Sequence, residues 1–142
     1  MKKVFLDSSV LVAASASLTG ASAYILGLCR EKKIKGYISI DVINESRKNI
    51  FLKLNKKAQK RFIVFKKLAN LIIVSPPNKG LIHISAKVIN IKDAPILAAA
   101  IESKADFLVS LDRKDFLRPK VLEFAKPLKI ILPGVFVMKY LR

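Results

Sequence analysis

Residues 93–116 read DAPILAAAIESKADFLVSLDRKDF, and they predict a helix followed by a buried strand. The Ala-rich part, 93–104, has helix-forming composition, while 106–110 is a short apolar run typical of a strand inside a sheet. Asp93 opens the predicted helix, and Asp112 comes shortly after the predicted strand. The whole chain has 10 acidic residues against 27 Lys and Arg. Acids this scarce, placed where apolar elements begin and end, indicate a chemical role.

The same alternation of strands and helices extends over the rest of the chain. We expect further strands at 3–6, 37–40, 71–74 and 129–132, and further helices at 19–33, 41–54, 58–68 and 81–89. Asp41 is expected to cap its helix, because Asp accepts hydrogen bonds from the first free amides. The alternation predicts an α/β fold with a parallel sheet covered on both faces. With no internal repeat and no linker, the 142 residues are expected to form one domain, 1–142.

The charge is strongly positive, with a formal net value of +17 at pH 7. Basic residues concentrate between Arg30 and Lys67, and Lys is much more frequent than Arg along the chain. This composition suits attraction to phosphate groups better than bidentate reading of bases. Two interpretations stay open at this point: a footprint for a polyanion, or a set of solvated helix faces.

The N-terminal stretch MKKVFLDSSVLVAASA has some features of a signal peptide. Asp7 interrupts its apolar part, and a carboxylate at membrane depth costs about 2.5–3.5 kcal/mol. Cys29 is the only cysteine, so no internal disulfide can form. We therefore expect a cytoplasmic protein with no association with a membrane.

Four acids are candidates for one site. Asp7 follows the first predicted strand, and Glu45 lies one helical turn beyond Asp41, while Asp93 and Asp112 flank the fourth strand. In a parallel sheet, such positions meet at the carboxyl edge of the strands. Carboxylates gathered there repel one another unless a cation lies between them. Oxygen ligands without His or Cys favour Mg²⁺ or Mn²⁺ over zinc.

Simpler roles exist for three of these acids taken singly. Asp93 has the position of a helix N-cap, and Asp112 and Asp115 have the spacing of a capping-box variant. Glu45 has Lys48 within reach on the same helix face. Asp7 is hardest to explain in this way, because a carboxylate among apolar residues is costly without a partner. The prediction of a metal site therefore depends on the combination.

Several stretches together resemble the PIN domain family, namely VFLDSSVLVAA at the start, INES at 43–46, the quoted block 93–116 and the final KIILPGVF. The likeness is to small single-domain members that include the VapC-type toxin ribonucleases, and it covers nearly the whole chain. It implies a three-layer α/β/α fold with a central, mainly parallel sheet of four or five strands. It also implies metal-dependent cleavage of single-stranded RNA.

Site residues follow from the resemblance position by position. Asp7, Glu45, Asp93 and Asp112 match the acidic quartet of the family. Ser110 matches a hydroxyl that helps to orient the last aspartate, and Asp115 matches an acid found in some members. Ser9 stands where many relatives have Asn, and its hydroxyl can still bind a carboxylate or water.

The sequence as a whole predicts a metal-dependent endoribonuclease, with Mg²⁺ or Mn²⁺ as cofactor and with the four acids as catalytic and metal-binding residues. We expect the RNA backbone to contact a set of basic side chains: Lys48, Lys53, Lys56, Lys57, Lys60 and Arg61. The resemblance also implies a homodimer, and a cognate antitoxin if the protein is the toxin of a toxin–antitoxin pair. Two other classes stay open: a non-catalytic RNA-binding or scaffold module, and a receiver-like phosphoacceptor domain. The latter would have paired acids at the start, which the chain lacks.

Overall fold

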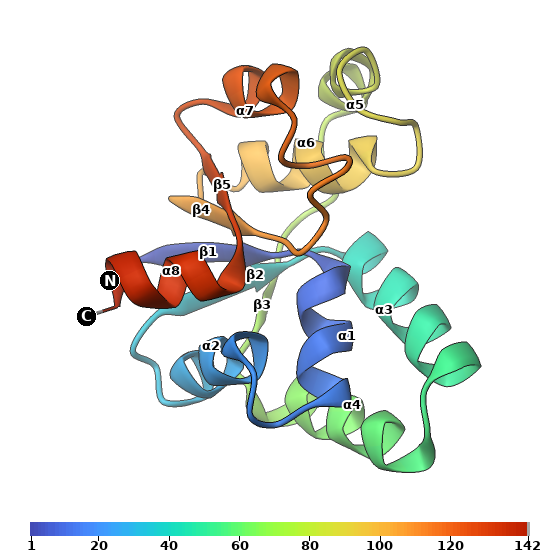
Figure 1. The fold of residues 1–142 in the computed structure, drawn as a ribbon. Helices are drawn as coiled ribbons and strands as arrows, with labels where there is room; N and C mark the ends of the chain where they lie inside the picture. The colour runs from blue at the N-terminus through green and yellow to red at the C-terminus, as the bar shows by residue number, and fades with distance from the viewer. Residues whose placement is uncertain (142) are drawn as a thin grey trace.

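The centre of the molecule is a five-stranded sheet in which every pairing is parallel. A computed structural model describes residues 1–141. The strand order is β3-β2-β1-β4-β5 (Figure 1). The strand bounds are β1 Lys3–Leu6, β2 Lys35–Ile38, β3 Ile72–Ile73, β4 Phe107–Val109 and β5 Lys129–Ile131. All five predicted strands are thus present, although β3 is only two residues long.

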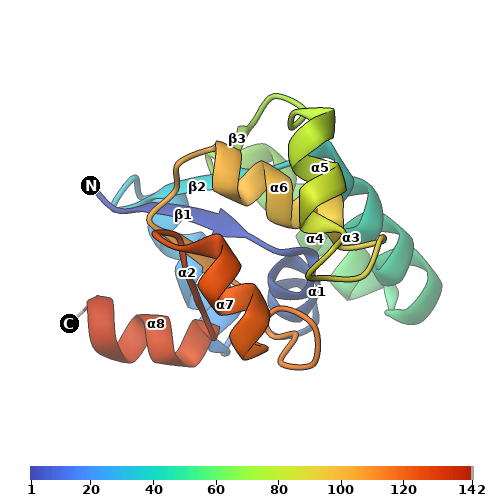
Figure 2. The same cartoon turned by 90° about the horizontal axis from the view of Figure 1, so that it is seen from above.

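Helices cover both faces of this sheet and complete three α/β/α layers. Figures 1 and 2 show α5, α6 and α7 on one side and α1, α2 and α4 on the other. The helix bounds are α1 Ser8–Ala16, α2 Ala21–Arg30, α3 Ile40–Lys53, α4 Lys56–Leu68, α5 Lys79–Ser85, α6 Ala94–Glu102, α7 Pro119–Ala125 and α8 Pro133–Tyr140. The α/β fold class predicted from the sequence is confirmed.

The order of the strands creates a crevice between β1 and β4. From β1 the chain builds outward to β2 and β3, whereas β4 and β5 add on the opposite side of β1. The connections therefore leave in opposite directions at the β1–β4 boundary, which is where open α/β sheets bind ligands. Leu6 is in register with Val109 at the carboxyl ends of these two strands. The residues that directly follow Leu6 and Val109 in the chain therefore lie at the crevice.

Apolar burial fixes the two central strands in place. Val4, Phe5 and Leu6 are fully buried, and so are Leu108 and Val109 in the neighbouring strand. Strands that are buried on both faces lack the alternation of apolar and polar residues that a half-exposed strand shows. The FLV run of the opening quotation is such a strand, so its burial positions the acids that follow it.

Some expectations about the helices were wrong. Ser39, not Asp41, is the N-cap residue of α3, and its hydroxyl accepts a hydrogen bond from the Val42 amide at 3.2 Å. The helix begins at Ile40, so Asp41 already lies in its first turn. Helices α1, α7 and α8 were not predicted at all. No single helix within residues 1–141 has the length and apolar character needed to cross a membrane, although α1 and α2, bent by 101°, meet these criteria as a pair.

Candidate active site

Asp7 is held in a fixed orientation at the end of β1. Its amide donates to the Val109 carbonyl at 3.1 Å, which continues the β1–β4 pairing by one residue. Its carboxylate Oδ2 accepts hydrogen bonds from the hydroxyls of Ser9 at 2.8 Å and Ser110 at 2.7 Å. Asp7 is only 3% exposed. Burial raises the pKa of Asp7 above its ordinary value, while the two serine hydroxyls and the Ser8 amide act in the opposite direction.

The same two serines connect Asp7 to the loop after β4. The Ser9 hydroxyl accepts from the Leu111 amide at 3.0 Å, and the Ser110 hydroxyl accepts from the Asp112 amide at 3.0 Å. A buried hydroxyl that both donates and accepts has its rotamer fixed. Ser9 and Ser110 therefore set the position of Asp7 relative to Asp112.

Asp93 lies at the start of α6, and Asn90 holds its side chain. Asn90 Nδ2 donates to Asp93 Oδ2 at 2.7 Å, and the Asp93 amide donates to Asn90 Oδ1 at 3.0 Å. Asp93 has the N-cap position of α6, but its carboxylate makes no capping hydrogen bond to the helix. Capping therefore does not explain this acid. Burial, followed by the charges of Asp7, Glu45 and Asp112, raises the pKa of Asp93 from 3.8 to about 6.

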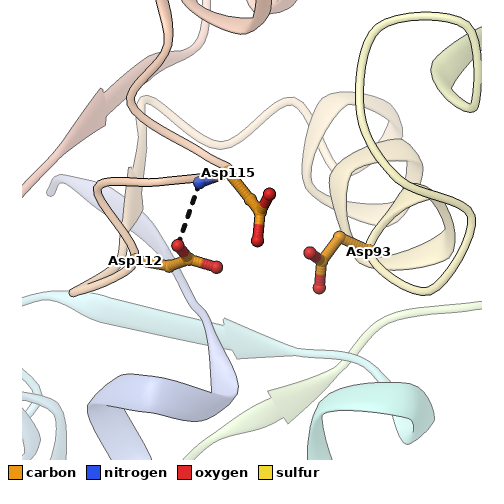
Figure 3. Close-up of side chains that lie close together, drawn as sticks. All are labelled: Asp93, Asp112 and Asp115. Atoms are coloured by element: carbon orange, nitrogen blue, oxygen red, sulfur yellow. Dashed lines mark hydrogen bonds between the residues drawn. The ribbon is translucent and has the colours of Figure 1, made fainter.

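Asp112 and Asp115 lie on the loop after β4 and face Asp93 across the crevice (Figure 3). The Asp115 amide donates to Asp112 Oδ1 at 3.0 Å, so the local capping interaction expected from their spacing is present. One carboxylate oxygen from each of Asp93, Asp112 and Asp115 lies within 4.8 Å of the others. Asp112 thus accepts a local hydrogen bond and also lies close enough to Asp93 for both carboxylates to bind one cation.

Glu45 reaches the site from α3. Its side chain is 20% exposed, and its Oε1 lies 3.5 Å from Nζ of Lys92, which is 77% exposed. The pairing with Lys48 that the sequence left open is not the one found among the ion pairs of residues 1–141. Glu45 instead joins α3 to the segment that leads into α6.

These side chains surround one pocket, which we call the acidic pocket. Its volume is about 520 Å³. The lining residues are Asp7, Ser8, Ser9, Val12, Ala13, Glu45, Asn49, Lys53, Leu54, Asp93, Leu111 and Asp112. Four carboxylates from distant points of the chain are therefore brought together. Burial is the main cause of the raised pKa of Asp93, and the charges of the other three carboxylates add to it, so a bound cation would offset both effects.

The six basic residues expected to bind RNA are distributed unevenly. Lys53 lines the acidic pocket, and Lys48 and Lys53 line a pocket beside it. Lys56, Lys57 and Lys60 are exposed on α4 and line neither of these two pockets.

Arg61 is in a different situation from the lysines. Its Nη1 donates to the carbonyls of Ser15 at 3.1 Å and Ala16 at 3.3 Å. These carbonyls belong to the last turn of α1, where helix carbonyls lack partners within the helix. Arg61 thus has a structural role at the end of α1.

Three polar residues near the carboxylates were not predicted from the sequence. Asn90 holds Asp93, Lys92 pairs with Glu45, and Asn49 lines the acidic pocket. Asn90 could have been noticed, because it precedes Asp93 by three residues and Asn readily binds backbone and side chains at that distance. Asn49 lies four residues after Glu45, on the same face of α3.

Comparison with known proteins identifies the family. The PIN domain family model matches residues 3–114, which is most of the chain. The chain therefore belongs to the PIN domain family, as the resemblance of its motifs indicated. No curated protein sequence matches closely enough to count as a relative.

Solved structures with a similar fold include chains from two complexes with DNA fragments. A chain of VapBC2 from Rickettsia felis, crystallised with a DNA fragment from its promoter, is 22% identical with a TM-score of 0.66; the match covers 91% of this chain and 97% of that one. PAE2754 from Pyrobaculum aerophilum is 20% identical with a TM-score of 0.64, covering 99% and 98%. A chain of FitAB bound to the IR36 DNA fragment is 20% identical with a TM-score of 0.55, covering 92% and 94%. At these identities the likeness concerns the fold.

Proposed function

We propose that this protein is a metal-dependent endoribonuclease that hydrolyses phosphodiester bonds of single-stranded RNA. The observation that carries the proposal is the acidic pocket, where Asp7, Glu45, Asp93 and Asp112 meet at the β1–β4 crevice. Keeping four carboxylates together, two of them buried, is costly unless a cation binds them. Membership of the PIN domain family supports the same reading.

The ligand chemistry of the pocket fits Mg²⁺ or Mn²⁺. Its charged ligands are carboxylates, with no His or Cys among the lining residues. Hard oxygen ligands of this kind suit Mg²⁺ and Mn²⁺. Asp7, Asp93 and Asp112 would hold the ion, with Asp115 close enough to Asp93 and Asp112 to take part. When bound, the ion lowers the pKa of a water ligand and neutralises charge on the reacting phosphate.

The remaining residues position these ligands. Ser9 and Ser110 keep Asp7 in one rotamer, and Asn90 does the same for Asp93. Glu45 lines the acidic pocket from α3. Its role in this proposal is to orient the attacking water or to bind a second ion. Lys53, at the rim, supplies a positive charge for the phosphate backbone.

The test uses two conservative variants, Asp7→Asn and Asp112→Asn. Each removes one negative ligand while keeping the shape of the side chain, so cleavage of single-stranded RNA in Mn²⁺ should fall by at least about a hundredfold. Circular dichroism and thermal unfolding of both variants serve as the folding control. Glu123→Gln, which changes an exposed acid that lines neither the acidic pocket nor the pocket beside it, is the matched variant that should cleave like the wild type. Wild-type activity in folded Asp7→Asn and Asp112→Asn would contradict the proposal.

The similarity to chains of VapBC2 and FitAB leads to a proposal about partners. The protein would act as the toxin of a toxin–antitoxin pair, as a homodimer held by a cognate antitoxin. A net charge of +17 suits an acidic partner segment as well as RNA. Light scattering of the purified protein, alone and after co-expression with the product of a neighbouring gene, would test both assemblies.

A further inference from the structure

A second pocket adjoins the acidic pocket and extends away from the carboxylates. Its volume is about 450 Å³, and Glu45, Asn49 and Lys53 line both pockets. The other residues around it are Asp41, Asn44, Lys48, Leu52, Lys92 and Ile96. Each pocket has the size of a ligand site, about 300–1,000 Å³. We call the second pocket the α3–α6 groove, because its walls come from α3 and from the start of α6.

One face of α3 forms the longer wall of this groove. Its lining residues recur every three or four positions from Asp41 to Lys53, which places them along one side of the helix. At 1.5 Å per residue, this wall is about 18 Å long. Lys92 and Ile96 form the opposite wall, and Figure 2 shows α3 passing beside α6. The groove is thus an extended path that begins at the acidic pocket.

The charge changes along this path. The acidic pocket has four carboxylates and one lysine, Lys53, in its lining, whereas the groove has three lysines beside two carboxylates. The three are Lys48, Lys53 and Lys92, so the balance of charge in the lining changes from negative to positive. Lys92 stands near the junction, 3.5 Å from Glu45. An ion pair with such an exposed lysine is worth at most about 1 kcal/mol, so Lys92 can turn to another anion at little cost.

Neutral side chains complete the lining. The Asn44 and Asn49 amides offer donors and acceptors, and Leu52, at 73% exposed, offers apolar surface. Cations for phosphates, together with amides and an apolar surface for bases, are what a single strand needs from a binding groove. A duplex would present its phosphates at fixed spacing and keep its bases stacked inside.

We propose that single-stranded RNA leaves the acidic pocket through the α3–α6 groove, with Lys48, Lys53 and Lys92 contacting its phosphates. This inference rests on the proposed function, because it takes the acidic pocket as the place of cleavage. Of the six basic residues expected from the sequence to contact RNA, it keeps Lys48 and Lys53, and it adds Lys92 in place of those on α4. Lys57 and Lys60 line neither pocket, and the RNA path runs along α3 instead.

The experiment compares two double variants that remove the same charge. Lys48→Ala with Lys92→Ala removes two groove lysines, and Lys57→Ala with Lys60→Ala removes two exposed α4 lysines. Fluorescence anisotropy with a labelled single-stranded RNA of about ten nucleotides measures binding by the full chain in EDTA, so that no cleavage occurs. Titrations at several salt concentrations give the number of phosphate contacts.

The groove variant should bind roughly tenfold more weakly, and its slope of log affinity against log salt should be shallower by about 1.4, or about 0.7 per lysine. The α4 variant should stay within about twofold of the wild type. Equal weakening of RNA binding in both variants would contradict the proposed path, because it would indicate that RNA is attracted to the basic surface in general.

Two further results bear on the proposal. If poly-glutamate binds with the same dependence on Lys48 and Lys92 while RNA binding does not change, the groove is a site for an acidic peptide and the proposal is wrong. If the wild type binds RNA through these lysines but does not cleave it in Mn²⁺, the groove stands and the nuclease function fails. The two hypotheses are thus separated by different measurements.

Discussion

At the scale of single residues, the site is defined by how each carboxylate is held. Asp7 is buried and accepts hydrogen bonds from two serine hydroxyls, whereas the carboxylate of Asp93 accepts a hydrogen bond from the Asn90 side chain. Asp7 and Asp112 stood out in the sequence, because each follows an apolar run in a chain poor in acids, whereas Asp93 and Glu45 were singled out by their places near the starts of predicted helices. Asn90 was missed although its three-residue spacing to Asp93 is a local signal. Lys92 could not be assigned, because its partner Glu45 is known only once α3 lies beside the segment that leads into α6.

Asp93→Asn should stabilise the metal-free protein at neutral pH. The pKa of Asp93 is about 6 in the folded protein and 3.8 for the free side chain. The folded state therefore binds more protons between these values, so the stabilisation present below about pH 4 is lost as the pH rises through 6. Removing the charge should raise the free energy of unfolding at about pH 7.5 by on the order of 1–3 kcal/mol. Denaturant unfolding in EDTA measures this difference.

The pH series provides the control for this prediction. At about pH 3.5, where wild-type Asp93 is mostly protonated in both states, the difference in stability between the two proteins should be much smaller than at neutral pH. Glu123→Gln, which changes an exposed acid far from the acidic pocket, should alter the stability by less than about 0.5 kcal/mol at either pH. A variant destabilised at neutral pH would show that the Asp93 charge is compensated without a metal ion.

At the scale of elements, burial explains which helices the sequence revealed. Helix α3 has a polar face and an apolar one, so its spacing was recognisable, although its cap was assigned two residues too late. Helix α1 follows Asp7 directly and is apolar almost all round, with Val10, Leu11 and Ala14 buried. Its pattern has no helical period to detect. Helices α7 and α8 are short and begin at a proline, which is a weak signal without tertiary contacts.

The packing of β2 against α2 gives a prediction at this scale. A Cβ on Gly36 would lie 2.7 Å from Cys29 Sγ and 2.8 Å from Leu71 Cδ2. Gly36→Ala should therefore reduce the free energy of unfolding by about 1–3 kcal/mol, because the β2 backbone or its neighbours must shift. Gly27→Ala is the matched control, since its Cβ would meet nothing within 4 Å. That variant should be neutral or slightly stabilising, because Ala favours the α2 helix.

At the scale of the whole molecule, the fold was the most predictable property and the placement of the basic side chains the least. Strand and helix alternation indicated a parallel α/β sheet, and the order of strands then fixed where the acids meet. The sequence did not show which of the basic side chains lie near the acidic pocket. The chain has basic residues on most helices, and only the folded structure separates Lys48 and Lys92 in the groove from Lys57 and Lys60 on α4.

Mn²⁺ should stabilise the folded protein as a whole. An ion that binds only the folded state raises the free energy of unfolding by about 2.7 kcal/mol at one hundred times its dissociation constant. Thermal unfolding followed over a Mn²⁺ titration should therefore show a rising Tm for the wild type and a much smaller rise for Asp112→Asn. A wild type that does not respond would favour the non-catalytic scaffold over the nuclease.

The pairing of β1 with β4 also has a consequence for synthesis of the chain. Asp7 leaves the ribosome about a hundred residues before its amide and carboxylate partners, Val109 and Ser110, are made. A nascent chain that stops before residue 107 has the first aspartate but lacks both its neighbouring strand and Asp112. The acidic pocket is thus completed only after residue 112 has been made, and fragments that end before it cannot assemble the pocket.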